Sequence, residues 1–186
     1  MATEKSEGHM NAKDGDAPAS YSRDVEGLHE IEAIKQLKAR YCRYLDTKDW
    51  GAWRAIFAAD FLSDTSESGG DVIAGADSFV AYTRGHIGKA SQPTVHQVHA
   101  PEIELTSDTT ATGVWALEDV VRLAPGLNLK GYGHYHETYE KINGRWYIKS
   151  SKLTRLREDL FNPVFTFRVP KRLRDAAGAL VRKRTK

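Results

Sequence analysis

The chain has 186 residues and a mass of 20.8 kDa, which suits one domain with its own hydrophobic core and leaves little room for a second. Apolar residues make up 40% and charged residues 28%, a composition typical of a folded globular protein. The longest apolar run is shorter than the roughly 20 residues of a membrane-spanning helix, and the N-terminus lacks the apolar segment of a secretion signal. We therefore expect a protein that is neither exported nor inserted in a membrane.

The net charge of +2 is unevenly distributed along the chain. Residues 170–186 hold seven basic side chains and one acidic side chain, which leaves 20 basic and 24 acidic side chains in residues 1–169. Because no base-reading motif accompanies the basic end, we interpret it as a solvated tail and expect no nucleic-acid partner. The single cysteine, Cys42, excludes internal disulfides and cysteine-rich zinc sites, and favours the reducing cytoplasm.

The first half of the chain carries helical signals. Residues 1–24 hold almost no apolar side chain, so they cannot offset the entropy lost on ordering and are predicted to form a disordered leader. Apolar residues then recur every three or four positions, which predicts an amphipathic helix whose lysines and arginines fill the opposite face. The predicted buried stripe consists of Leu28, Ile31, Ile34, Leu37, Tyr41 and Leu45.

A second, shorter helical stretch is predicted next, followed by a mixed connector. The stretch contains Trp50, Trp53, Ile56 and Phe57, and its N-cap can be Asp46, Thr47 or Asp49. Residues 63–70 are rich in serine and glycine and predict turns. A short helix is expected from Ala76 to His86.

Beyond Pro93 the apolar residues alternate with polar ones, which predicts antiparallel strands. Turn-forming pairs separate them, and Asn143-Gly144 is the strongest hairpin signal. Helices followed by a meander indicate an α+β fold, and a helix laid across a curved sheet encloses a pocket. The four strands are expected at residues 94–105, 110–123, 130–142 and 146–156.

The order of several short segments is more specific than any one of them. They are Tyr41–Asp46, Asp49-Trp50, Phe57–Asp60, Thr94–His99, Pro101–Leu105, Ala111–Trp115 and Gly144–Lys149. In this order they resemble the SnoaL-like branch of the nuclear transport factor 2-like superfamily, over about residues 26 to 160. The resemblance implies a cone-shaped α+β barrel domain over residues 25–160, between the leader 1–24 and a C-terminal extension 161–186.

The resemblance also implies a set of functional residues. Motif spacing is nearest to scytalone dehydratase and bile-acid 7α-dehydratase, whose catalytic residues would correspond to Tyr41, Asp46, His96 and Asp119. It implies a lyase or isomerase that needs no cofactor and no metal, dehydrating a polycyclic or aromatic hydroxy-carbonyl compound. The expected partners are a small hydrophobic substrate and further copies of the chain, as a dimer or trimer.

These residue types suit such chemistry. His96 can take a proton from an acidified C–H and return it to a departing hydroxyl, because imidazole titrates near neutrality. Asp46 would fix the imidazole tautomer, and Tyr41 would donate a hydrogen bond to the substrate carbonyl. Asp119 would orient the substrate or pair with His96. Five residues of regular helix separate Tyr41 and Asp46 by about 140°, so Asp46 must lie at or beyond the helix end.

Each assignment has a structural alternative. Tyr41 lies in the apolar stripe and could be a core residue, and Asp46 could be only an N-cap. His96 competes with His99, which has the opposite strand parity unless a bulge at Pro101 reverses it. Asp119 shares the parity of its apolar neighbours, and a carboxylate on a buried face is seldom without a role.

Further residues are expected around the pocket. Tyr44, Trp115, Tyr132 and His134 are the predicted substrate contacts. His134 and His136, together with His96 and Asp119, have residue types that can bind zinc, but the resembled enzymes use no metal and none is expected.

The end of the chain and the function itself leave alternatives open. The apolar segment from Phe161 to Val169 is expected to cover a pocket mouth or a neighbouring subunit, and residues 173–181 could extend it as a basic amphipathic helix. Alternative functions are an aldol cyclase of the polyketide type and a non-catalytic protein that binds a hydrophobic ligand or acts as an assembly subunit.

Overall fold

A computed structural model of the chain describes residues 19–168, 170, 172 and 173. Its helices are α1 (Ala19–Asp46), α2 (Trp50–Arg54), the 3-10 turn η1 (Ser66–Ser68) and α3 (Ala76–Ile87). Its strands are β1 (Phe57–Asp64), β2 (Val72–Ala74), β3 (Thr94–Leu105), β4 (Thr110–Ala124), β5 (Leu127–Ile142), β6 (Arg145–Phe161) and β7 (Thr166–Arg168).

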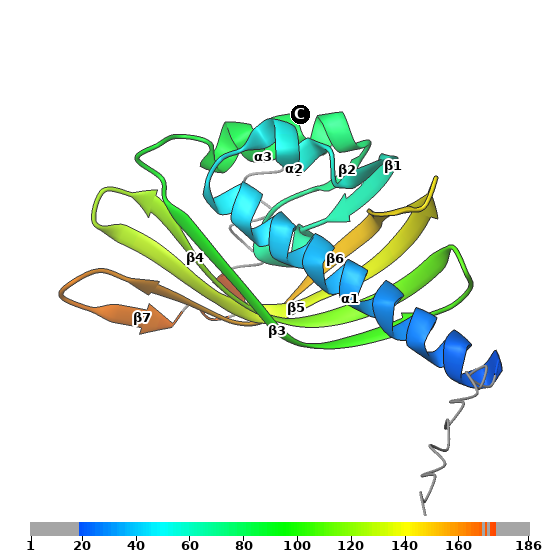
Figure 1. Ribbon diagram of the computed structural model, residues 1–186. Helices are drawn as coiled ribbons and strands as arrows, with labels where there is room; N and C mark the ends of the chain where they lie inside the picture. The colour runs from blue at the N-terminus through cyan, green and yellow to red at the C-terminus, as the bar shows by residue number, and fades with distance from the viewer. Residues whose placement is uncertain (1–18, 169, 171, 174–186) are drawn as a thin grey trace, which may run out of the picture.

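The strands form one curved sheet in the order β2-β1-β6-β5-β4-β3, with β7 pairing with β6 near the end of that strand. All pairs are antiparallel except β1 with β6. The long helix α1 crosses the concave face diagonally, and α2 and α3 lie together over one end of it (Figure 1). This arrangement confirms the predicted α+β cone, in which helices cover one face of a strongly twisted sheet.

The four predicted strands are confirmed, and β3 has the predicted bounds. Asn143 (φ 51°) and Gly144 (φ 78°) both adopt positive φ, as the tight turn between β5 and β6 requires. Strand β1 was not predicted, because Phe57 was assigned to the second helix and residues after Phe61 to turns. Its pairing with β6 is parallel and irregular in register, so β1 lacks the simple alternation that reveals an antiparallel strand.

Helix α1 differs from its prediction in three ways. It begins at Ala19, inside the predicted leader, while residues 1–18 lie outside the described part of the chain. Leu28, predicted to be buried, is 63% exposed, because the first turns of α1 extend beyond the sheet. Lys38 is fully buried although lysines were predicted to fill the outer face, and its ammonium lies 2.6 Å from the Glu137 carboxylate on β5. Position 38 shares the inner face with Ile34 and Tyr41.

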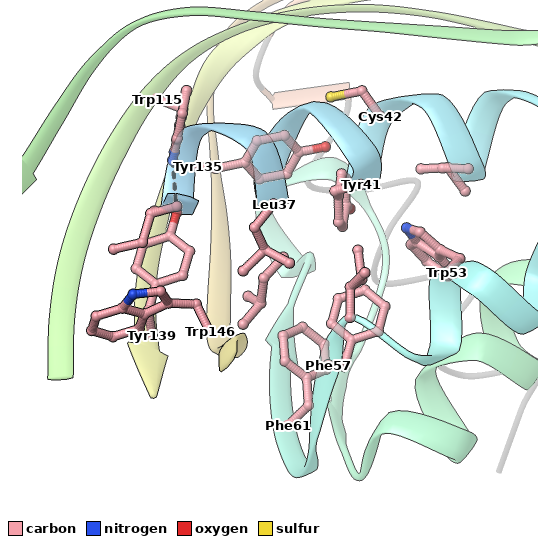
Figure 2. Close-up of a cluster of buried hydrophobic side chains, with 14 of the residues drawn as sticks. Leu37, Tyr41, Cys42, Trp53, Phe57, Phe61, Trp115, Tyr135, Tyr139 and Trp146 are labelled. Carbon is pink, nitrogen blue, oxygen red and sulfur yellow. Dashed lines mark hydrogen bonds between the residues drawn. The ribbon is translucent and has the colours of Figure 1, made fainter. Parts of the chain in front are cut away.

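The middle of α1 packs against a cluster of buried side chains (Figure 2). The part of this cluster around Leu37, Trp115, Glu137, Tyr139 and Trp146 is called the packed half of the cone. Buried apolar side chains surround a continuous polar network, in which the Trp115 indole donates to the Tyr139 hydroxyl and that hydroxyl donates to Glu137. Lys38 and the Ser151 hydroxyl donate to the other oxygen of Glu137. Each polar group of this network therefore has a partner, as buried polar groups require.

The C-terminal segment extends the sheet. Strand β7 pairs with residues 159–161 of β6, and in the loop between the two strands Val164 is 89% exposed and Phe165 is 53% exposed. The expected helix over residues 173–181 lies almost wholly outside the described residues. Within the part of the chain that the structure describes, no helix combines the length and the apolar character needed to span a membrane.

Candidate active site

The last turn of α1 positions the first functional side chain. Asp49 N–H donates to the Tyr44 carbonyl and Lys48 N–H donates to the Leu45 carbonyl, which is the hydrogen-bond pattern of a Schellman motif. Lys48 occupies the left-handed position of that motif with a φ of 61°, where glycine is the usual residue. A residue with a side chain costs roughly 1–2 kcal/mol in this conformation. The motif ends the helix directly after Asp46, as expected from the angle of about 140° between Tyr41 and Asp46 on a regular helix.

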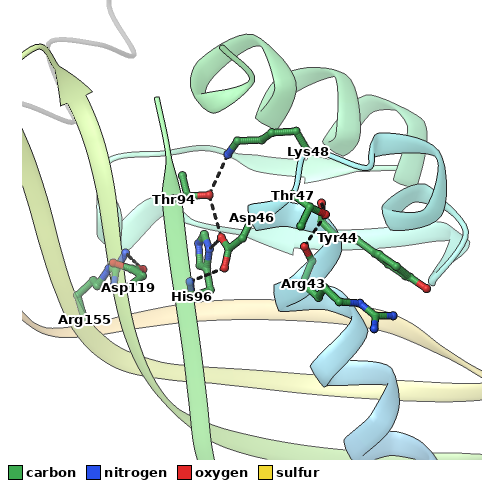
Figure 3. A network of polar contacts seen from close by, with 9 residues as sticks. All are labelled: Arg43, Tyr44, Asp46, Thr47, Lys48, Thr94, His96, Asp119 and Arg155. Carbon is green, nitrogen blue, oxygen red and sulfur yellow. Dashed lines mark hydrogen bonds and ion pairs between the residues drawn. The ribbon is translucent and has the colours of Figure 1, made fainter. Parts of the chain in front are cut away.

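Asp46 and His96 form a hydrogen-bonded pair between α1 and β3 (Figure 3). His96 Nδ1 lies 2.7 Å from Asp46 Oδ1, and the backbone N–H of His96 donates to Asp46 Oδ2 at 2.8 Å. That N–H is available because β3 is the edge strand of the sheet. The Thr94 hydroxyl also donates to Asp46 Oδ1 at 2.8 Å. The Asp46 carboxylate thus accepts three hydrogen bonds, and capping of α2 falls to Asp49 instead.

The pair fixes which imidazole nitrogen can act as a base. An ionised carboxylate only accepts hydrogen bonds, so Nδ1 of His96 must carry the proton that faces Asp46. The lone pair of the neutral ring is then on Nε2, on the side of the imidazole away from Asp46. Only 7% of the His96 side chain is exposed, which shields this nitrogen from bulk water.

Strand alternation explains why His96 rather than His99 lies at the chamber, because the two are three positions apart and the bulge in β3 comes after both. The register of β3 against β4 shifts between His99 and Glu102, where Ala100 has a φ of 45°. Before the bulge, Thr94 and His96 face the helices, and after it Ile103 and Leu105 do so. His99 is exposed. The two histidines therefore keep opposite parity, and the alternative in which a bulge reverses it is wrong; His96, the preferred residue, is the one that lines the chamber.

Asp119 and Arg155 form a second buried pair. Asp119 lies opposite His96 in the β3–β4 register and is 2% exposed, so it faces inward as predicted. Its Oδ2 accepts from Arg155 Nη2 at 2.7 Å, so its partner is Arg155 and not His96. An extra residue in β6, Leu156, interrupts the register against β5, so that both Arg155 and Glu158 have buried side chains.

Sequence reasoning missed Arg155, and the signal that could have found it is a glycine. Gly131 lies between Asp119 on β4 and Glu158 on β6 in the same row of cross-strand neighbours. A Cβ at Gly131 would lie 2.2 Å from Arg155 Nη1 and 2.4 Å from Asp119 Oδ1. The missing side chain provides the space in which the guanidinium and the carboxylate meet.

Within this pair, Arg155 Nη1 and Asp119 Oδ1 are buried and have no hydrogen-bond partner among the described residues, and the same is true of Trp53 Nε1 on α2. Burial acts to lower the pKa of Arg155, but the Asp119 carboxylate outweighs it and holds the pKa above its usual value, so the guanidinium stays cationic. Unpaired buried donors and acceptors are costly, and several at one place are typical of a ligand site.

The residues that carry these atoms belong to the lining of a chamber of about 270 Å³ between the helices and the sheet. Tyr41 and Trp53 form part of its wall, and the exposed side chain of His86 on α3 marks its solvent side. Burial is the main cause that raises the pKa of Tyr41 far above its ordinary value, so its hydroxyl remains a neutral donor at physiological pH. Polar side chains of the sheet in its lining include Ser63, His96, Asp119, Ser151 and Arg155.

The predicted catalytic set is therefore brought together, whereas the predicted substrate contacts are not. Tyr41, His96 and Asp119 line the chamber, and Asp46 lies behind His96. Tyr44 points away from the pair (Figure 3), and Trp115 belongs to the packed half. Tyr132 and His134 lie on the outer face of the sheet, because the inward positions of β5 are Gly131, Gly133 and Tyr135. These four expectations are corrected.

The alternation of side chains along β5 also separates the histidines that were considered as metal ligands. His134 and His136 project from the opposite face of the sheet to His96 and Asp119. Among the described residues, no group of three or more histidine, cysteine, aspartate or glutamate side chains is arranged to hold a metal ion.

Comparison with known proteins identifies the family and the fold. A model of the SnoaL-like domain matches residues 26–152. The curated protein "Probable cyclase FGR4" of Gibberella zeae is 26% identical over 137 residues, which cover 66% of this chain and 89% of that protein.

Solved structures share the fold. "Putative Scytalone Dehydratase" from Novosphingobium aromaticivorans is 23% identical, with a TM-score of 0.64 over 74% of this chain and 95% of that one. Hexachlorocyclohexane dehydrochlorinase LinA-type3 from Novosphingobium barchaimii is 14% identical, with a TM-score of 0.63 over 78% of this chain and 94% of that one. At these identities the likeness concerns the fold.

Proposed function

Because the chain belongs to the SnoaL-like family, whose fold hosts many activities, we propose its function from the chamber itself: a cofactor-independent lyase of the dehydratase type. The substrate would be an aromatic compound, with one to three rings, that carries a hydroxyl group β to a carbonyl. The observation that carries this proposal is the Asp46–His96 pair at a chamber whose lining also includes Arg155 and Asp119, a buried ion pair with polar atoms that have no partner among the described residues.

The geometry suits removal of a proton next to a carbonyl. His96 Nε2 would take the proton from the carbon between the carbonyl and the C–OH, while Asp46 stabilises the imidazolium that forms. Negative charge then develops on the carbonyl oxygen. Arg155 Nη1 and the Tyr41 hydroxyl are the donors available to hold it in a site shielded from water.

The second half of the reaction returns the proton. The C–O bond breaks, its electron pair leaves with the oxygen, and the His96 imidazolium gives up the proton it had taken, so that water departs and a conjugated enone remains. The imidazole ends neutral, and no oxidant or reductant is consumed. Asp119 Oδ1 is an acceptor for the substrate hydroxyl, which would orient the leaving group.

Size and lining support an aromatic substrate. A chamber of about 270 Å³ accommodates a compound of a few fused rings, and its walls include the rings of Tyr41, Trp53, Phe79 and Tyr135. Aromatic faces bind planar rings by stacking and edge contacts, while the polar residues lie on the sheet side.

The test measures both half-reactions with defined probes. Racemic β-hydroxy ketones fused to one, two or three aromatic rings are assayed for the absorbance of the conjugated product. Ring ketones without a hydroxyl, such as 1-tetralone, are assayed for exchange of the α-hydrogen in D₂O by NMR. We expect His96→Ala to lower kcat and the exchange rate at least about a hundredfold.

His99→Ala is the matched control, because His99 lies on the same strand but outside the chamber. It should leave both rates within about twofold of wild type. The proposal fails if no probe is turned over or exchanged above background, or if the two histidine variants behave alike. Retained probe binding without turnover would instead indicate a ligand-binding protein.

Aldol ring closure is the second candidate, favoured by the cyclase name of the Gibberella zeae relative. The same base would form a carbanion that attacks a second carbonyl of one substrate, so a C–C bond forms before any water is lost. Incubation with an aromatic methyl ketone bearing a second carbonyl distinguishes the two, because only a cyclase yields a product with a new ring.

A further inference from the structure

The hydrogen bonds of the Asp46–His96 pair continue to a third side chain outside the chamber. Lys48 Nζ donates to Thr94 Oγ1 at 2.8 Å, and the Thr94 hydroxyl donates to Asp46 Oδ1 at 2.8 Å. The direction of each bond is fixed, because an ammonium only donates and a carboxylate only accepts. A single hydroxyl thus links the cation of Lys48 to the anion of Asp46 (Figure 3).

The backbone of Lys48 makes this contact notable. A φ of 61° at the end of the helix is a conformation that glycine adopts freely and that other residues rarely adopt. The backbone hydrogen bonds of the Schellman motif do not require lysine at this position, since glycine would make the same bonds without the strain of a positive φ. What only lysine supplies is the side chain that reaches Thr94.

Burial makes the cation effective. Lys48 is partly buried, and burial lowers its pKa while Asp46 raises it. Thr94 is 4% exposed, so the connection runs through a region largely shielded from solvent. A positive charge three hydrogen bonds from His96 opposes formation of the imidazolium, and it counterbalances the carboxylate that favours it.

We propose that Lys48 is a positioning residue of the active site, which acts through Thr94 to orient the Asp46 carboxylate and to limit the protonation of His96. This rests on the proposed role of His96 as a general base. Without the cation, the imidazole would hold its proton to higher pH and would be less often available as a base.

Other charged and titratable groups around the pair stay constant in the test. They are Tyr41 and Cys42 on α1, His86 on α3, Asp119 on β4, Tyr135 on β5 and Arg155 on β6. None of them is changed by a substitution at position 48 or 94, so a shift in the titration of His96 reports on the removed link.

The experiment uses NMR of the ¹⁵N-labelled full chain and needs no substrate. The ring signals of His96 are identified as those that disappear in the spectrum of the His96→Gln variant. We expect Lys48→Met to raise the midpoint of the His96 titration by about 0.5 to 1 pH unit. Thr94→Val should shift it in the same direction. Lys48→Arg keeps the charge and should remain within about 0.2 unit of wild type, as should Thr94→Ser.

Lys48→Gly separates positioning from simple capping. Glycine relieves the positive φ, so the midpoint of thermal unfolding should hold or rise, while the His96 midpoint shifts as in Lys48→Met. On a probe that the wild type turns over, kcat at pH 7 should fall about three- to tenfold with KM little changed. A role in the fold alone would lower stability and leave the titration unmoved.

The outcomes are distinct from those of the proposed function. If Lys48→Met and Lys48→Gly leave the midpoint and the ring tautomer of His96 unchanged, or if Lys48→Arg behaves like Lys48→Met, the positioning role is wrong. If the titration shifts as expected but no probe is turned over by the wild type, the link stands and the dehydratase function fails.

Discussion

The two halves of the cone bury charge in contrasting ways. In the packed half, Lys38 and Glu137 are fully buried, the Glu137 carboxylate accepts three hydrogen bonds, and the Lys38 ammonium lies 4.0 Å and 3.7 Å from the ring centres of Tyr41 and Tyr135. In the chamber half, Arg155 and Asp119 are almost as buried, yet each keeps a polar atom without a partner. Burial is similar, so it is the completeness of hydrogen bonding that distinguishes a structural pair from a candidate site.

The same helix serves both halves. Tyr41 is in contact with the cation of the packed half and also lines the chamber, so α1 connects the two polar networks through one ring. We expect substitutions in the packed half to change mainly the free energy of unfolding, and those in the chamber half to change mainly turnover. Two predictions test this division, and a third concerns the thiol of Cys42 on the helix that both halves share.

The largest effect is expected in the packed half. Lys38→Met should lower the free energy of unfolding by about 3–5 kcal/mol, because it leaves the Glu137 carboxylate buried without its cation. Urea titration followed by tryptophan fluorescence measures the loss. The double variant Lys38→Met/Glu137→Gln should recover much of it, since the amide oxygen can accept from Tyr139 and the amide NH₂ can donate to the Ser151 hydroxyl. A double variant no more stable than the single one would contradict this account.

A smaller effect on stability, but a clear one on turnover, is expected from Gly131→Ala. Its methyl group would displace the ends of the Arg155 and Asp119 side chains, which can move at a cost of about 1–2 kcal/mol but would lose their alignment. Activity on a turned-over probe should fall at least about tenfold.

Gly113→Ala is the matched change in the packed half. A Cβ there would lie 3.0 Å from a Tyr139 ring atom, so stability should fall by a similar amount while activity stays within about threefold. Equal losses of activity in both alanine variants would show that the halves are not separable.

The smallest effect concerns the thiol of Cys42, which lies on α1 beside an open groove between α1 and β3. Burial is the main cause that raises the pKa of Cys42 to about 11, so the reactive thiolate is scarce at pH 8. Labelling by a disulfide reagent should be about a hundredfold slower at pH 8 in the native protein than in urea. It should accelerate as pH rises toward 11. Rapid labelling of the native protein at pH 8 would contradict the assigned environment.

The comparison also shows how far sequence reasoning extends. Strands β3 to β6 were predicted because alternation and hairpin turns are local signals, and Asp46 was placed at the helix end by the angle between helical residues. His96 was preferred through the family resemblance, and the regular alternation of β3 up to His99 places it inward.

The missed features share a physical cause, since each depends on residues far apart in the chain. Lys38 is buried only because Glu137, 99 residues later, neutralises it. Strand β1 joins the sheet by parallel pairing with β6, far along the chain, since its pairing with β2 covers only residues 62–64. Arg155 has a buried side chain where one added residue, Leu156, interrupts the register against β5, and no local pattern indicates such an addition.

The bulge at Ala100 has a consequence for how this fold tolerates change in length. One strand presents His96 to the chamber and Ile103 and Leu105 to the packed core only because the extra residue reverses the alternation between them. If that residue were deleted, a strand with uninterrupted alternation could direct either His96 or the pair Ile103 and Leu105 inward, but not both. Insertions and deletions in β3 should therefore be tolerated only in pairs, whereas the outer turns can vary singly.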